Sequence, residues 1–92
     1  MPIRWTSSAA FDLTQISDCT QVRFSPTQAR RTALTIYDAA ESLSTHPYRG
    51  RPGRKPDTRE LVISGLPFVI IYRPRTNDIE ILRILHGAQK WP

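Results

Sequence analysis

Apolar side chains recur at helical spacing near the start of the chain. Leu13 and Ile16 lie three residues apart, after the pair Ser7–Ser8, whose hydroxyls can cap a helix. Asp12 adds a negative charge that we place in the first turn, where the helix dipole favours it. The pattern predicts a first helix from about residue 8 to residue 21.

A second helix has a stronger start signal. Ser25 can cap it, Pro26 suits the first helical position, and Gln28 can close a capping box. One apolar stripe then follows at spacings of 4, 3, 4 and 3: Ala29, Ala33, Ile36, Ala40 and Leu43. The pattern predicts a second helix that ends near Ser44, with small alanines that allow close packing against the first.

The region from His46 to Thr58 breaks the helical pattern. It contains three prolines and two glycines, with basic side chains between them. Proline lacks a backbone donor and glycine is conformationally free, so we expect an irregular basic loop here.

Runs rich in β-branched residues predict strands on both sides of the helices. Short turns at residues 65–67 and 74–77 separate the last three runs, and short links require antiparallel neighbours. The predicted strands are Ile3–Thr6, Arg59–Ser64, Phe68–Arg73 and Asp78–Leu85.

The order of these elements predicts an α+β fold of the type β-α-α-β-β-β. An N-terminal strand leads into a helical hairpin, and a three-stranded antiparallel meander follows. With 92 residues the chain has the length of one domain, which we take to span residues 1–92. The apolar stretches are too short to span a bilayer and no signal segment opens the chain, so we expect a cytoplasmic protein without a membrane partner.

The charge is distributed unevenly. Residues 1–48 carry four basic and four acidic side chains, whereas residues 49–92 carry nine basic and four acidic ones, which accounts for the net charge of +5. Eleven of the basic residues are arginines and two are lysines. The arginine fork suits phosphate and carboxylate groups, so the second half is expected to face a polyanion or an acidic protein.

The sequence gives little indication of a metal site or of a catalytic nucleophile. His46 and His86 are the only histidines, and neither belongs to a metal-binding motif. The single cysteine, Cys19, forms no intrachain disulfide and has no basic neighbour in sequence that would activate it. We therefore expect no metal and no cofactor.

Three residues of the second half suit the cleavage of RNA through its 2′-hydroxyl. That reaction needs a base, an acid and stabilisation of the phosphorane charge, which His86, Arg59 and Arg83 can supply without a metal. The alternative is that both arginines pair with Glu60, Glu80 or the carboxylates of a partner. Strand alternation separates Arg83 from His86 onto opposite faces, unless the strand bulges or ends near residue 85.

The chain resembles the RelE/ParE superfamily of bacterial toxins. The resemblance rests on residues 58–73 and 79–92, on the 43–51 run with His46-Pro47-Tyr48 and Gly50-Arg51, and on the opening Trp5 to Leu13. It covers nearly the whole chain, and its family fold is the β-α-α-β-β-β arrangement that the patterns predict independently.

The resemblance implies the toxin of a type II toxin–antitoxin module, of the plasmid-stabilisation type, that a cognate antitoxin neutralises. RelE-like members cleave mRNA on the ribosome, whereas ParE-like members are associated with poisoning DNA gyrase and lack the ribonuclease residues. Arg59, Arg83 and His86 match positions used by ribonuclease members, but no tyrosine follows His86 in Gly87-Ala88-Gln89. The prediction is therefore a ParE-like toxin, with a RelE-like endoribonuclease and a non-toxic binding module as alternatives.

Five further basic residues are assigned to recognition. We expect the antitoxin to be acidic and to fold on binding, because a basic surface attracts a disordered acidic segment. The residues expected to contact the antitoxin or the target are Arg49, Arg51, Arg54, Lys55 and Arg73.

Overall fold

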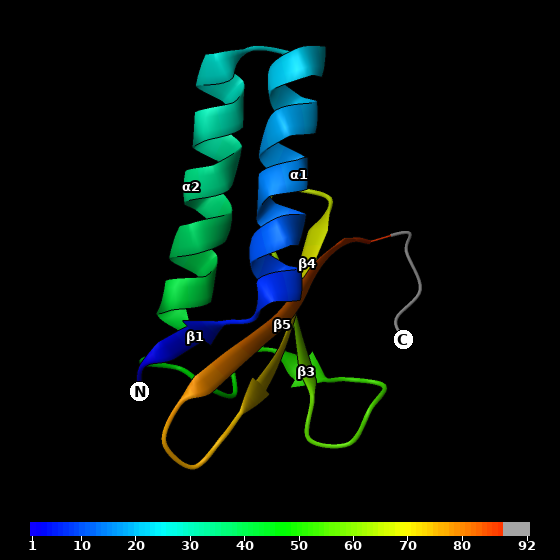
Figure 1. Ribbon diagram of the computed structural model, residues 1–92. Coiled ribbons are helices and arrows are strands. Elements are labelled where there is room, and N and C mark those ends of the chain that lie inside the picture. Colours follow the sequence, from blue (N-terminus) through cyan, green and yellow to red (C-terminus); the bar gives the residue numbers. More distant parts are fainter. Residues whose placement is uncertain (88–92) are drawn as a thin grey trace.

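Two long helices stand side by side against one face of a twisted sheet (Figure 1). The computed structural model describes residues 1–87 of the chain, so the last five residues of the family resemblance lie outside the described part. The elements are β1 (Ile3–Trp5), α1 (Ser7–Arg23), α2 (Pro26–Ser42), β2 (Arg51–Pro52), β3 (Arg59–Val62), β4 (Phe68–Pro74) and β5 (Ile79–His86). This order confirms the predicted α+β fold.

Helix α1 begins one residue earlier than predicted and uses a different cap. The hydroxyl of Thr6 accepts a hydrogen bond from the Ala9 N–H at 3.1 Å, so neither Ser7 nor Ser8 is the cap. Asp12 consequently lies beyond the first turn, which carries no acidic residue. The prediction of a helix-dipole role for Asp12 is wrong, because its carboxylate turns towards the sheet instead.

Helix α2 begins as predicted. Ser25 caps it by accepting a hydrogen bond from the Gln28 N–H at 3.0 Å. The capping box does not close, because the Gln28 amide reaches forward to the Thr32 hydroxyl at 3.4 Å. Thr32 is buried, whereas Ala33 is only partly buried, so the buried stripe is shifted by one residue there.

The sheet has the strand order β1-β5-β4-β3-β2. The last three long strands form the predicted antiparallel meander, and β1 lies parallel to β5 at one edge. The basic loop, predicted to be irregular, contributes the two-residue strand β2, which pairs with the start of β3. β1 pairs only with residues 79–81, so the outer edge of β5 beyond Ile81 faces α1.

The core lies between the helical hairpin and one face of the sheet. The largest side chains in it are fully buried: Tyr72, Ile36, Leu43, Ile70, Ile79 and Ile81. A register shift between Ile71 and Tyr72 leaves an extra residue in β5, so Tyr72 pairs with Ile81 and Ile71 pairs with Arg83. No helix among residues 1–87 is long and apolar enough to cross a membrane.

Candidate functional site

An open groove with basic walls lies between the loop that joins β2 to β3 and the turn that joins β4 to β5. Both segments lie at the end of the molecule opposite the α1–α2 turn (Figure 1). The groove has a volume of about 940 Å³, and its charged lining residues are Arg54, Lys55, Asp57, Arg59, Arg73 and Arg75. It therefore brings together four residues that the sequence analysis selected: Arg54, Lys55, Arg59 and Arg73. In total its described lining holds five basic residues and one acidic residue.

Arg59 supports the wall of this groove. Its Nε donates to the Gly50 carbonyl oxygen at 2.9 Å and its Nη2 to the Tyr48 carbonyl oxygen at 3.4 Å. The guanidinium carbon also lies 5.1 Å from the centre of the Tyr48 ring, within the range of a cation–π contact. Arg59 thus ties β3 to the segment after α2, and it bonds to carbonyl oxygens rather than to Glu60 or Glu80.

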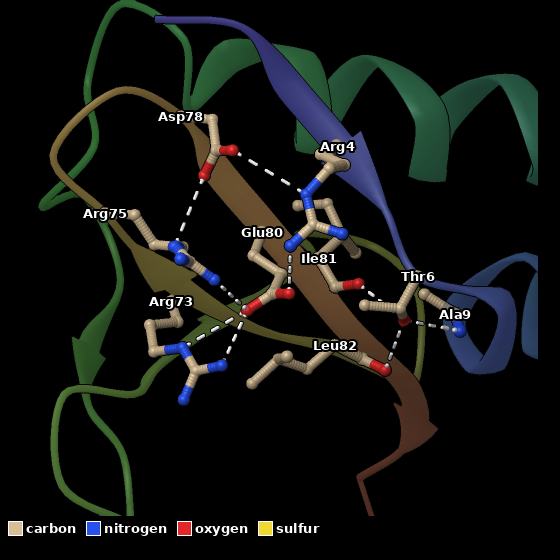
Figure 2. A network of polar contacts seen from close by, with 9 residues as sticks. All are labelled: Arg4, Thr6, Ala9, Arg73, Arg75, Asp78, Glu80, Ile81 and Leu82. Carbon is tan, nitrogen blue, oxygen red and sulfur yellow. Dashed lines mark hydrogen bonds and ion pairs between the residues drawn. The ribbon is translucent and has the colours of Figure 1, made fainter.

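A single carboxylate anchors three arginines beside the groove (Figure 2). Arg73 donates to Glu80 Oε1 at 2.7 and 3.2 Å, Arg4 binds the other oxygen, and Arg75 lies 3.7 Å from Oε1. Asp78 extends the network, with its Oδ2 3.6 Å from Arg4 and its Oδ1 3.9 Å from Arg75. The arginine side chains stay 41–51% exposed while that of Glu80 is only 9% exposed, so the cluster presents positive charge to solvent.

The same network sets the protonation of Glu80. The hydrogen bond from Arg73 is the largest influence and lowers the pKa of the carboxyl. Burial acts in the opposite direction, and Arg4 adds a further lowering. Glu80 is therefore ionised at neutral pH, accepts two hydrogen bonds from Arg73 and attracts the guanidinium of Arg75.

Arg83 lies outside the groove and is held by α1. Its Nε and Nη2 donate to the two carboxylate oxygens of Asp12, at 2.7 and 3.1 Å. The Ile84 N–H donates to the same carboxylate at 3.0 Å, so Asp12 occupies the part of the β5 edge that β1 leaves open. The hydrogen bond that Arg83 donates to Asp12 is also the main reason that the pKa of Arg83 is raised.

His86 is the last residue of β5 and packs beside the helices. Its ring meets that of Phe68 edge to face, with centroids 5.9 Å apart. Pairing between β4 and β5 is regular from Ile71–Arg83 to Phe68–His86, because the register shift comes before Arg83. Arg83 and His86 are three positions apart in this regular stretch, so their side chains leave opposite faces of the sheet.

The trio considered for RNA cleavage is spread across the sheet. Arg59 pairs with Tyr72 and His86 pairs with Phe68, four residues away along β4. At the usual rise of a strand, this offset alone is about 13 Å. Arg59 lines the basic groove, and Arg83 lines neither that groove nor the hollows around His86. His86 lines one hollow with residues of both helices, and a small second hollow with Arg51 and Arg54.

The remaining predicted contact residues lie along the loop that leads to the groove. Arg49 donates to the Ser42 hydroxyl at 2.7 Å, and Arg51 pairs with Glu60 at 3.1 Å. Arg54 makes no hydrogen bond or ion pair with any other residue in the described range, and it is exposed. Arg54 lines both the groove and a small hollow that it shares with Arg51, Glu60 and His86.

The sequence patterns assigned no functional role to two residues of the groove, Tyr48 and Arg75. Tyr48 is 70% exposed and lines the groove, although it was noted only as part of a family pattern. Arg75 sits in the β4–β5 turn, and only the hairpin brings it beside Arg73 and the β2–β3 loop. Each of them directly follows a proline, Pro47 or Pro74. Prolines often mark the ends of elements, so these positions could have indicated exposed loop residues near a site.

The described residues offer no cluster suited to a metal ion. No group of three or more histidine, cysteine, aspartate or glutamate side chains gathers anywhere in residues 1–87. Cys19 is an exposed residue of α1 and, within this range, is a free thiol.

Comparison with known proteins gives consistent matches over the length of the chain. Residues 3–91 match the family described as the ParE toxin of type II toxin–antitoxin system, parDE. A protein of Sinorhizobium fredii named Putative toxin Y4kP is 40% identical over 90 residues, which are 98% of this chain and 92% of that protein. Toxin RelE2 of Caulobacter vibrioides is 42% identical over 85 residues, which are 92% of this chain and 93% of that toxin.

A solved structure shares the fold. It is titled Chromosomal ParDE TA system from P. aeruginosa and superimposes with a TM-score of 0.88 at 32% identity. The match covers 94% of this chain and 95% of the matched chain. The β1 to β5 arrangement described above is thus shared with a chain of that ParDE system.

Proposed function

The chain belongs to the ParE family of toxins of type II toxin–antitoxin systems, and from this premise we propose that it arrests growth by poisoning DNA gyrase. A cognate antitoxin neutralises it in this proposal. Gyrase acts in the cytoplasm, which is therefore where the toxin would act.

The choice of gyrase over mRNA as the target rests on the contacts of Arg83. A metal-independent ribonuclease needs its acid, its base and its charge-stabilising group around one phosphate. Here Asp12 engages the Arg83 guanidinium at 2.7 Å, and His86 leaves the other face of the sheet. Arg59 is bonded to two carbonyl oxygens at a distant point of β3. This dispersion favours a toxin that acts by binding over one that cleaves RNA.

The decisive experiment separates the two targets directly. Induced expression is followed by labelling of DNA and protein synthesis, and the purified toxin is added to gyrase with DNA and to translating ribosomes. We expect DNA synthesis to stop first, gyrase to be trapped on cleaved DNA, and ribosome-bound mRNA to stay intact. His86→Ala should remain toxic, as should His46→Ala, the matched change at the other histidine. Codon-positioned mRNA cuts that disappear in His86→Ala alone would overturn the proposal.

A second candidate function is a RelE-like, ribosome-dependent mRNA endoribonuclease. It is favoured by the presence of Arg59 in a strongly basic groove and by the similarity to a protein named as a RelE toxin. In this case a loss of His86 would remove a proton-transfer group that typically contributes about 10²–10⁴-fold in rate. The non-toxic binding module considered from the sequence is set aside, because the family is one of toxins.

The antitoxin is proposed to be an acidic segment that folds on the toxin. Family membership implies a cognate antitoxin, and the matched structure is titled as a ParDE system. The excess of positive charge in residues 49–92 supports an acidic partner. Co-expression with the product of the neighbouring reading frame should restore growth, and a failure to bind that product would contradict this pairing.

A further inference from the structure

We propose that the basic groove is a binding site for single-stranded nucleic acid. Cations on its two walls contact successive phosphates, and Tyr48 is the platform on which one base stacks. The inference goes beyond the proposed poisoning of gyrase, because that proposal names a protein target and no contact of the groove with a single strand. It rests on the charge, the fixed geometry and the aromatic surface of the groove.

The charge balance of the groove favours a phosphate backbone. Among the described residues, five cations and one acidic residue, Asp57, line it. Glu80 and Asp78 pair with two of these cations, Arg73 and Arg75, without lining the groove. Guanidinium groups bind phosphate oxygens through paired donors, and neutralising phosphates releases counterions from the nucleic acid. The groove is also open to solvent, which suits a segment of a longer chain rather than a small enclosed ligand.

Ion pairs restrain the arginines of one wall before any ligand binds, Arg73 more tightly than Arg75. Glu80 holds Arg73 at 2.7 Å and lies 3.7 Å from Arg75, yet both arginines remain 41% and 51% exposed. A side chain that is already fixed loses little conformational entropy when it binds. Glu80 is thus a positioning residue, which leaves donors of Arg73 and Arg75 exposed for phosphate. Arg54, which is exposed, supplies a cation from the loop that joins β2 to β3.

Tyr48 distinguishes a single strand from a duplex. The Arg59 guanidinium covers one face of its ring at 5.1 Å, and the side chain remains 70% exposed. An aromatic ring backed by a cation offers its other face to a base, but only an unstacked base can reach it. Three prolines also line the groove and give apolar surface for sugars: Pro52, Pro56 and Pro74.

The test measures binding of the purified toxin to labelled oligonucleotides by fluorescence anisotropy. The probes are an oligothymidine and an oligouridine of about 12 nucleotides, a duplex of the same length, and a polyglutamate of matched charge. We expect the toxin to bind at least one of the single strands more tightly than the duplex and the polyglutamate. Equal binding of all four probes would overturn the proposal, since charge alone would then explain it.

Variants assign the binding to individual parts of the groove. Tyr48→Ala should weaken single-strand binding about 5- to 100-fold, the usual range for a lost base–aromatic stack, while Tyr48→Phe should retain it. Arg54→Ser with Lys55→Ser should weaken binding and reduce the salt slope by about 1.4, for two lost phosphate contacts. Asp57→Asn should strengthen binding, because it removes the one negative charge while an asparagine still tolerates the positive φ of 64°.

A matched control excludes a general effect of net charge. Arg30→Ser with Arg31→Ser removes two exposed cations from the first half of α2, near the α1–α2 turn and far from the groove (Figure 1). This pair should leave the affinity nearly unchanged. An equal loss in the control pair, or an unchanged affinity in both Tyr48→Ala and Asp57→Asn, would overturn the assignment. Asp57→Asn is expected to bind more tightly, and a misfolded protein would not show this result.

Discussion

At the scale of single residues, one hydroxyl holds the loop on which the groove depends. Tyr72 is fully buried, and its hydroxyl donates to the Pro47 carbonyl oxygen at 2.8 Å and accepts from the Gly50 N–H at 2.9 Å. Gly50 has no room for a side chain, because an added Cβ would lie 2.7 Å from the Glu60 carbonyl oxygen and 2.8 Å from the Tyr72 ring. The segment that carries Tyr48 is therefore pinned to the centre of β4.

Tyr72→Phe should destabilise the protein by about 1–3 kcal/mol, the usual cost of leaving buried backbone groups without partners. Urea unfolding of the purified chain measures this loss. The control is Tyr37→Phe, which removes an exposed hydroxyl whose partner is Glu41. A stability of Tyr72→Phe equal to that of the control would show that the hydroxyl does not hold the loop.

The lowered pKa of Glu80 predicts a dependence of stability on pH. A carboxyl whose pKa is lower in the folded state stabilises that state above its unfolded pKa of about 4.5, and the contribution disappears as the pH falls through the folded value. The wild type should therefore lose more of its unfolding free energy than Glu80→Gln on acidification. Unfolding midpoints measured from neutral to acidic pH test this, with Glu41→Gln as an exposed control. Parallel curves for wild type and Glu80→Gln would refute it.

At the scale of elements, α1 serves as an extension of the sheet edge. β1 is only three residues long, and beyond it Asp12 takes the Ile84 N–H that a longer neighbouring strand would bind. Thr6 joins the same edge, since its hydroxyl caps α1 and donates to the Ile81 carbonyl oxygen at 2.8 Å. The helical hairpin and the sheet are thereby fixed relative to each other by polar contacts as well as by the core.

Asp12→Ala should destabilise the protein by about 1–3 kcal/mol, because the Ile84 N–H and the Arg83 guanidinium both lose their acceptor. Asp18→Ala removes an exposed carboxylate from the same helix and serves as the control. Thermal or urea unfolding compares the two variants. Indistinguishable stabilities would mean that the Asp12 contacts contribute nothing net.

At the scale of the whole molecule, positive charge is concentrated at the groove end. The net charge of +5 arises entirely from residues 49–92, and the groove and its approach loop hold most of the cations of that half. A field of this kind accelerates the encounter with an acidic partner and weakens as salt is added.

Arg51→Glu combined with Arg54→Glu should slow association with the antitoxin and flatten the dependence of the association rate on salt. Stopped-flow or surface-binding kinetics at several salt concentrations measure both quantities. Arg30→Glu combined with Arg31→Glu changes the net charge equally at the other end of the molecule. If both double variants changed the salt slope alike, steering by the groove end would be ruled out.

Sequence patterns alone were sufficient for the two helices, the four longer strands and their order, but not for the two-residue strand β2. Helical periodicity, the Ser25-Pro26 start and the β-branched runs are local signals, and each acts through backbone preferences over a few residues. Tight turns then leave antiparallel pairing as the only geometry for the last three strands. The uneven charge also follows from the sequence directly, and it pointed to four of the residues that line the groove.

Only the tertiary structure decided which charged groups act together. Asp12 meets Arg83 across 71 positions of sequence and Arg4 meets Glu80 across 76, and no local pattern encodes such contacts. The register shift within β5 is likewise a property of paired strands, and the regular pairing after it places Arg83 and His86 on opposite faces. Local preferences determined the elements because they act between neighbours in the chain. The site depended on packing, which brings distant residues together only when the sheet and the helices have formed.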